Sequence, residues 1–174
     1  MKGFGNVDFV IADVSSDGSI GQFLSVELQA VDITGSVYDT YLALRNGDQL
    51  VGKIKAKGWN WDNVYKRYVT QLIRKGYFHH HWKTKIVAVI QEQLYRYIVS
   101  RADFMRSTNV KDDNVNIIFM TYRFEDDPLR PGQFVPVLTT VEGTSHSALQ
   151  NAILYAEAPS RDEFCDRIKR SLSR

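Results

Sequence analysis

Two carboxylates and one amide, from Asp8, Glu27 and Gln29, are the side chains of this sequence whose types and spacing favour chemistry. Gln29 follows Glu27 by two residues, so in a strand both point to one face. Two facing carboxylates repel each other, and a divalent cation between them reverses the sign of that interaction. Magnesium suits such a pair because it keeps several waters and takes only one or two carboxylates. An ion of this kind polarises a phosphate and generates hydroxide, which is the chemistry of phosphodiester hydrolysis. The alternative is that the three side chains only form the solvated face of a hairpin.

A β-hairpin is the element that has to bring Asp8 and Glu27 together. The segments 7–14 and 22–31 are rich in β-branched and apolar residues, and the dipeptide Asp17-Gly18 between them is a strong hairpin signal. With this dipeptide as a two-residue turn, Asp8 lies directly opposite Glu27, with Cβ atoms roughly 4.5–5.5 Å apart. The sequence therefore predicts that both carboxylates meet on one patch of the sheet.

The motif made by Asp8 and Glu27-Leu28-Gln29 resembles that of the PD-(D/E)xK nucleases. The longer stretch FLSVELQAVDITGSV, residues 23–37, resembles the restriction endonuclease NotI and its relatives, which have E-x-Q in place of E-x-K. The resemblance implies metal-dependent cleavage of double-stranded DNA. It implies that Asp8 and Glu27 bind Mg²⁺ and that Gln29 stands at the lysine position, so that all three are candidate catalytic residues.

The chain departs from that family pattern in two respects. Gln29 is neutral, so it can orient a water by hydrogen bonds and cannot stabilise hydroxide by charge. Only seven residues precede Asp8, and there is a single cysteine, Cys165, whereas NotI relatives have a four-cysteine metal-binding segment near the N-terminus. We therefore expect one nuclease-like domain, residues 1–174, that lacks the usual N-terminal helix and strand. Asp13 and Asp17 are the alternatives for the metal-binding aspartate, Asp13 only if a bulge turns its side chain.

The composition is that of a globular protein, and one basic segment of it is either a solvated face or a surface that contacts phosphates. Hydrophobic residues make up 44% and charged residues 24% of the 174 residues, so one domain with a real core is expected. No apolar run approaches membrane-spanning length and no signal peptide is visible, so we expect a cytoplasmic protein. The segment 49–90 carries nine basic residues against one acid, Asp62. Such a block is suited to a phosphate backbone. The candidate DNA-binding residues are Lys53, Lys55, Lys57, Lys66, Arg67 and Arg74.

Hydrophobic periodicity predicts the elements after the hairpin. A helix is expected at 63–77, ended by Gly76, with an apolar stripe and a basic opposite face. The three consecutive histidines, residues 79–81, are not expected to bind one metal together, because neighbouring residues of a strand point to opposite sides. We expect them in a loop. The apolar run 86–90 is typical of a parallel strand buried on both faces, and a helix is expected at 92–100.

Two further strands and two further helices are expected in the C-terminal part. The strands, 114–124 and 134–141, should pair with each other, and a helix should follow at 145–156. A capping box that begins at Ser160 predicts a last helix. That helix should bury Phe164, Cys165, Ile168 and Leu172. The fold class is thus α/β: a restriction-endonuclease-like core with a mixed sheet, an antiparallel hairpin, a crossover helix and flanking helices.

The sequence favours a magnesium-dependent DNA endonuclease, a type II restriction enzyme or its catalytic part. A palindromic target would imply a homodimer. One alternative is a non-catalytic DNA-binding or assembly module with a nuclease fold. Another is a repair or junction nuclease that selects DNA structure. We expect Mg²⁺ as the cofactor and double-stranded DNA as the partner, with no membrane.

Overall fold

The computed structural model describes residues 4–30, 42–43, 45–47, 61–155 and 160–172. Within these ranges the chain is an α/β protein with one five-stranded sheet. The strands are β1 (Phe9–Val14), β2 (Ile20–Gln29), β3 (Lys85–Gln91), β4 (Ile117–Asp126) and β5 (Phe134–Thr144). The helices are α2 (Trp61–His81), α3 (Glu92–Arg101), α4 (His146–Leu154) and α5 (Arg161–Leu172).

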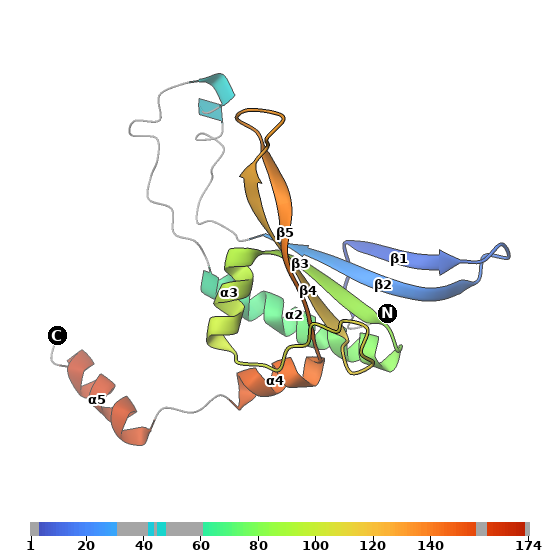
Figure 1. Ribbon diagram of the computed structural model, residues 1–174. Coiled ribbons are helices and arrows are strands. Elements are labelled where there is room, and N and C mark those ends of the chain that lie inside the picture. Colours follow the sequence, from blue (N-terminus) through green and yellow to red (C-terminus); the bar gives the residue numbers. More distant parts are fainter. Residues whose placement is uncertain (1–3, 31–41, 44, 48–60, 156–159, 173–174) are drawn as a thin grey trace.

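The sheet is mixed, as the sequence predicted. Its strands lie in the order β1-β2-β3-β4-β5; β2, β3 and β4 run parallel, and the outer pairs β1–β2 and β4–β5 are antiparallel. The helix α2 connects β2 to β3, so the expected hairpin, crossover helix and buried parallel strand follow one another along the chain. Figure 1 shows both hairpins extending beyond the helices, with α2 lying across the sheet.

The N-terminal hairpin has the predicted register but reaches it by a different route. Its loop has three residues, because Ser15 N–H donates to Ser19 O at 2.9 Å and Gly18 adopts a left-handed φ of +82°. An extra β2 residue opposite Asp13 then shifts the pairing by one. The two deviations cancel, and Phe9 pairs with Val26. Asp8 directly precedes the first paired residue of β1, and its carboxylate accepts a hydrogen bond from the N–H of Leu28, next to Glu27.

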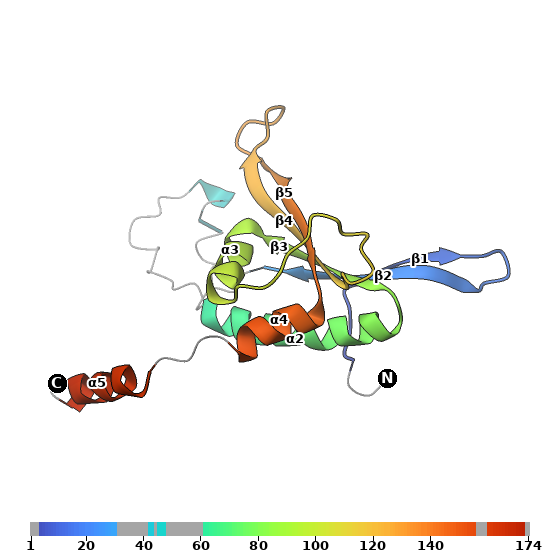
Figure 2. The ribbon, with the colours of Figure 1, turned by 60° about the horizontal axis from the view of Figure 1, so that its bottom comes forward.

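The main core lies between one face of the sheet and three helices. Inward side chains of β3 and β4 (Ile86, Ala88, Ile90, Ile117 and Phe119) pack against buried side chains of α2, α3 and α4 (Tyr68, Leu72, Leu94, Ile98 and Leu149). Ala88 pairs with Glu27 and lies on this covered face. Since side chains alternate along a strand, Ser25, Glu27 and Gln29 share the helix-covered face of the sheet. Figure 2 shows α2 and α4 side by side beneath the strands.

The opposite face of the sheet carries a second, smaller cluster. Val87 and Ile118 are buried there under Val115 of the connection between α3 and β4. Strand β3 is therefore covered on both sides, as its apolar sequence predicted. Toward the edge strand the covering ends, and Phe9 and Ile11 are 58% and 62% exposed.

The helix α2 is longer than the sequence predicted, and two expectations about it were wrong. The histidines 79–81 form its last turn, where a loop was expected. Gly76 does not end the helix; it lies in its interior, where a Cβ atom would come within 2.8 Å of Ile117 Cδ1 and 3.0 Å of His146 Cβ. The glycine is thus explained by close packing of α2 on β4 and α4, and its low helix propensity is overridden by tertiary contacts.

The C-terminal helices divide into one that packs and one that does not. Ser145 caps α4 by accepting from Ala148 N–H at 3.0 Å, and Leu149 is fully buried. The predicted capping box of α5 is confirmed, since Glu163 N–H donates to Ser160 Oγ and Ser160 N–H to Glu163 Oε2. Its predicted buried face was wrong. None of its residues is buried, and Figures 1 and 2 show α5 apart from the sheet and the other helices. Phe164, Ile168 and Leu172 are exposed and Cys165 is half-buried.

Candidate active site

The patch around Asp8 and Glu27 lies where the hairpin leaves the main core. Glu27 points toward α2 and is 8% exposed, whereas Asp8, at the start of β1, is exposed. Oδ2 of Asp8 accepts a hydrogen bond of 2.7 Å from the backbone N–H of Leu28, beside Glu27. This bond connects the two strands at the level of the predicted pair. The structure therefore brings both predicted carboxylates together.

Lys75 is a residue of this patch that sequence reasoning did not assign to it. Its ammonium group forms a buried ion pair with Oε1 of Glu27 and donates to the carbonyl oxygen of Asn6 at 2.6 Å. Lys75 lies 48 residues after Glu27 along the chain, on α2. The signal in the sequence was its position: Leu72 and Lys75 are three residues apart, and hence on one helix face.

Gln29 lies on the same face of β2 but makes a different contact. Its side-chain Nε2 donates to the carbonyl oxygen of Ala30 at 2.6 Å. The amide is neutral, so it adds no charge to the patch. The position that resembles the lysine of E-x-K is therefore occupied by a group that bonds to the neighbouring backbone.

Tyr68 adds a buried hydroxyl that has no hydrogen-bond partner among the described residues. The residue is 2% exposed and lies seven residues before Lys75, two turns away on the same face of α2. Burial raises the pKa of its phenol far above the ordinary value, and the nearby charges of Glu27 and Asp8 raise it further. The hydroxyl stays protonated and remains a donor close to both carboxylates.

A buried histidine attaches α2 to β2 on the same face. His79 Nδ1 lies 2.7 Å from the carbonyl oxygen of Lys75, and Nε2 lies 2.8 Å from Ser25 Oγ. Since a carbonyl only accepts, Nδ1 carries the proton and Nε2 accepts from Ser25. Burial lowers the pKa of His79, which favours this neutral form. Phe4 packs on His79 at 5.6 Å between ring centroids, which holds the segment that leads to Asp8.

The donor set of the patch fits a hard divalent cation. Protein donors engage one oxygen of Asp8 and one of Glu27, so each carboxylate keeps a second oxygen. Two carboxylates with room for water are the usual protein ligands of magnesium. In the described part of the chain, no group of three or more His, Cys, Asp or Glu side chains is placed to hold a metal ion. Asp8 and Glu27 are the two carboxylates of this patch that could hold such an ion.

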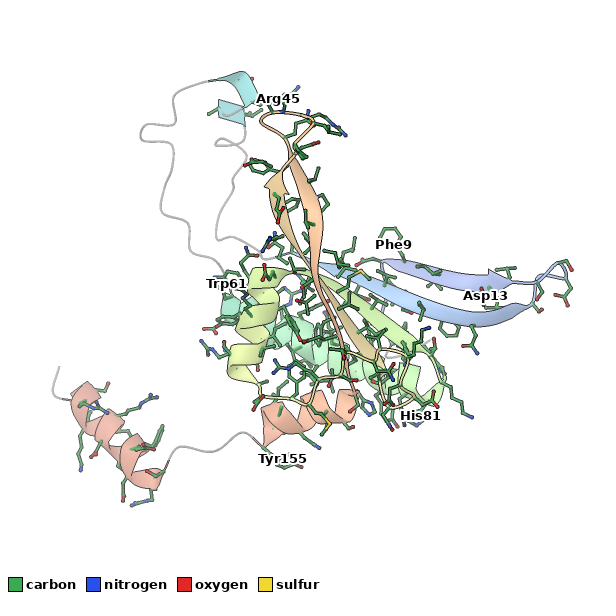
Figure 3. All side chains as sticks on the ribbon, in the orientation of Figure 1. Phe9, Asp13, Arg45, Trp61, His81 and Tyr155 are labelled. Carbon is green, nitrogen blue, oxygen red and sulfur yellow. The ribbon has the colours of Figure 1, made fainter. Side chains whose placement is uncertain are left out.

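The alternative aspartates lie farther along the hairpin. Asp13 lies opposite the extra residue of β2, five residues from Asp8 and thus roughly 16 Å along the strand. Figure 3 labels it well out on the hairpin. Asp17 lies in the loop, where its carboxylate accepts from Ser19 N–H at 3.0 Å, which lowers its pKa.

The predicted DNA-binding residues are only partly described. Lys66, Arg67 and Arg74 are exposed on α2, so its predicted basic face is confirmed. By the helical step of about 100° per residue, Lys66 lies about 180° around the helix from Lys75 and faces away from the carboxylates. Lys53, Lys55 and Lys57 lie outside the described residues.

The fold and the paired carboxylates are together consistent with a nuclease. The family model of restriction endonuclease NotI matches residues 1–134. The chain therefore belongs to the NotI restriction endonuclease family, whose members cut double-stranded DNA. The match includes the hairpin, α2, β3, α3 and all of β4, and it ends at the first residue of β5; α4 and α5 lie outside it. Neither the curated proteins nor the solved structures gave a match. No helix in the described ranges has the length and apolar character needed to cross a bilayer.

Proposed function

We propose that this protein is a magnesium-dependent type II restriction endonuclease that hydrolyses phosphodiester bonds of double-stranded DNA at the Asp8–Glu27 patch. One observation carries the proposal: Asp8 is hydrogen-bonded to the backbone of β2 beside Glu27, and Glu27 is buried beside a lysine. Membership in the NotI family supports the same reaction. We also propose the E-x-Q form of the PD-(D/E)xK motif for residues 27–29.

The reaction that we propose is a simple displacement at phosphorus. A water oxygen bonds to phosphorus, the bond from phosphorus to one bridging oxygen breaks, the water loses a proton to solvent and the leaving oxygen gains one. When bound, the magnesium ion supplies charge stabilisation for the phosphate and acidifies a water. Asp8 and Glu27 would hold the ion, and the Leu28 N–H orients Asp8 for that role.

The exposed basic residues of α2 are proposed to contact the DNA backbone. Lys66, Arg67 and Arg74 add positive charge without reading sequence, since phosphate contacts carry no base information. Most of this binding energy comes from counterion release, so it weakens with salt. A homodimer is proposed for a palindromic target, because a two-fold symmetric site is matched by a two-fold symmetric protein.

Cleavage of supercoiled plasmid with Mg²⁺ tests the proposal. We expect discrete linear fragments from the wild-type protein, and a loss of at least about a hundredfold in rate in Glu27→Gln and Asp8→Asn. Asp13→Asn, a matched change on the same hairpin, should cut like the wild type. A site at Asp13 would reverse this order. DNA binding without cleavage by the wild-type protein would support the non-catalytic module, and preferential cutting of branched DNA would support a junction nuclease.

A further inference from the structure

The E-x-Q motif supplies no positively charged side chain to the candidate active site. Asp8 and Glu27 contribute two negative charges, while Gln29 is neutral and donates to the carbonyl oxygen of Ala30. A phosphodiester adds a third negative charge, and the transition state of its hydrolysis adds more. A preorganised cation at the reacting phosphate is the usual way to stabilise such charge. Gln29 does not provide this positive charge. Besides the metal ion, another side chain must therefore provide it.

Lys75 is placed to provide that charge. It is 7% exposed, its ammonium group is paired with Glu27, and it comes from α2 rather than from β2. An ammonium group has three N–H donors. Glu27 Oε1 and Asn6 O accept two of them, which leaves one donor for a further acceptor.

Tyr68 gives an independent indication that a ligand belongs beside Lys75. Its hydroxyl is buried without a partner among the described residues, and Glu27 and Asp8 both act on it electrostatically. An unpaired buried hydroxyl is destabilising, so such groups usually mark a site for water or for a ligand. Tyr68 and Lys75 lie on one face of α2, and both interact with the carboxylate of Glu27.

We infer that α2 completes the active site: Lys75 donates to the scissile phosphate as the cation that Gln29 does not supply, and Tyr68 donates its hydroxyl to the same phosphate or to the attacking water. This inference rests on the proposed function. It assigns two catalytic residues outside the E-x-Q motif, and it makes the ion pair with Glu27 the resting state of a lysine that turns to the phosphate when DNA and Mg²⁺ are bound.

The first test compares Lys75→Met, Lys75→Arg and Lys111→Met in single-turnover plasmid cleavage with saturating DNA and Mg²⁺. We expect Lys75→Met to lose about a hundredfold or more in rate while its DNA affinity in EDTA changes less than about threefold. Lys75→Arg should recover at least about tenfold over Met, because it restores the charge. Lys111, exposed between α3 and β4, is the matched control and should cut like the wild type.

Tyr68→Phe keeps the test valid if Lys75→Met folds poorly. This change removes only a hydroxyl without a partner, so a structural role predicts an unchanged or higher melting temperature and unchanged cleavage. The inference predicts an unchanged or higher melting temperature and cleavage slowed about tenfold or more. Wild-type cleavage rates in both Tyr68→Phe and Lys75→Met would overturn it.

A third measurement does not use activity. We expect Mg²⁺ to raise the melting temperature of the wild type and of Lys75→Met alike, because Asp8 and Glu27 remain. If that rise disappears in Lys75→Met, Lys75 only shapes the metal site and the inference is wrong. Glu27→Gln separates the two proposals. Cleavage lost in Glu27→Gln but kept in Lys75→Met overturns the inference alone, whereas a wild-type protein that does not cut overturns the proposed function and this inference together.

Discussion

The imidazole of His79 and the hydroxyl of Ser25 form a buried hydrogen bond of 2.8 Å between α2 and β2. Through the carbonyl oxygen of Lys75, the same imidazole is bonded to the turn of the helix that carries the candidate lysine. One neutral histidine therefore fixes how far α2 is rotated against the strand that carries Glu27. The position of Lys75 relative to Glu27 depends on this contact.

We predict that stability falls as pH falls through the range where free histidine titrates. Burial lowers the pKa of His79, so below about pH 6.5 the unfolded chain takes up a proton that the folded chain does not. The stabilisation is complete above that pH and declines toward the lower pKa of the folded state. Urea unfolding at pH 5, 6, 7 and 8 should show a pH slope of at most about 1.4 kcal/mol per unit from this group.

The control variants isolate the contribution of His79. The pKa of His146 is also lowered, by burial and by His80 and His81, so this residue also makes stability fall as pH falls. The pH slope of the free energy of unfolding is therefore compared between variants. His79→Gln should flatten the dependence, and Thr70→Ala, an exposed change on the same helix that removes no titrating group, should leave it as in the wild type. Equal slopes in the wild type and His79→Gln would show that His79 is not the titrating group.

We predict that Gly76→Ala destabilises the protein although alanine is the better helix former. The propensity gain is about 1 kcal/mol, but the new Cβ would lie 2.8 Å from Ile117 Cδ1, and overpacking costs about 1–3 kcal/mol. A lower urea midpoint is the expected result. The double variant with Ile117→Val should recover part of the loss. Thr70→Ala on the exposed face of α2 is the control for propensity alone.

We predict opposite outcomes for two single-residue deletions in the hairpin. Deleting Ile11 shifts the first part of β1 by one residue, which sets Asp8 opposite Val26 and turns it to the other face of the sheet. Deleting Gln22 removes the extra residue of β2 and leaves Asp8 opposite Glu27. Cleavage should be lost when Ile11 is deleted and kept when Gln22 is deleted. Equal far-ultraviolet circular dichroism spectra of the two variants would show that both are folded. Activity in both would mean that the register does not position the site.

We predict that the apolar face of α5 contributes little to the stability of the isolated chain. Phe164 is 58% and Ile168 45% exposed, so changing both to serine should move the free energy of unfolding by less than about 0.5 kcal/mol for each. Leu149→Ala in α4 is the contrast, with an expected cost of about 2–5 kcal/mol. A large loss from the α5 variant would show that this face is covered in solution.

The sequence determined the elements and most of their order, because local signals specify them. The hairpin, the buried strand of residues 86–90, the paired β4 and β5 and the capping box at Ser160 all follow from residue type and period. The register of Phe9 with Val26 also followed, since the register of a short hairpin is decided within the hairpin. The predicted register was right although two details of the hairpin were not predicted. The loop has three residues where two were expected, and an extra residue in β2 shifts the pairing back by one.

Only the tertiary structure decided which distant side chains join Asp8 and Glu27. Lys75 was counted among the basic residues of its segment, because no local pattern tells a buried lysine from a solvated one. Its partner becomes visible only when the crossover helix packs on β2. Gly76 and the histidines 79–81 were misread for the same reason: tertiary packing extends α2 past a residue that ends helices elsewhere. Hydrophobic periodicity likewise identified the apolar face of α5. Periodicity shows which side of a helix is apolar, but it does not show whether another element covers that side.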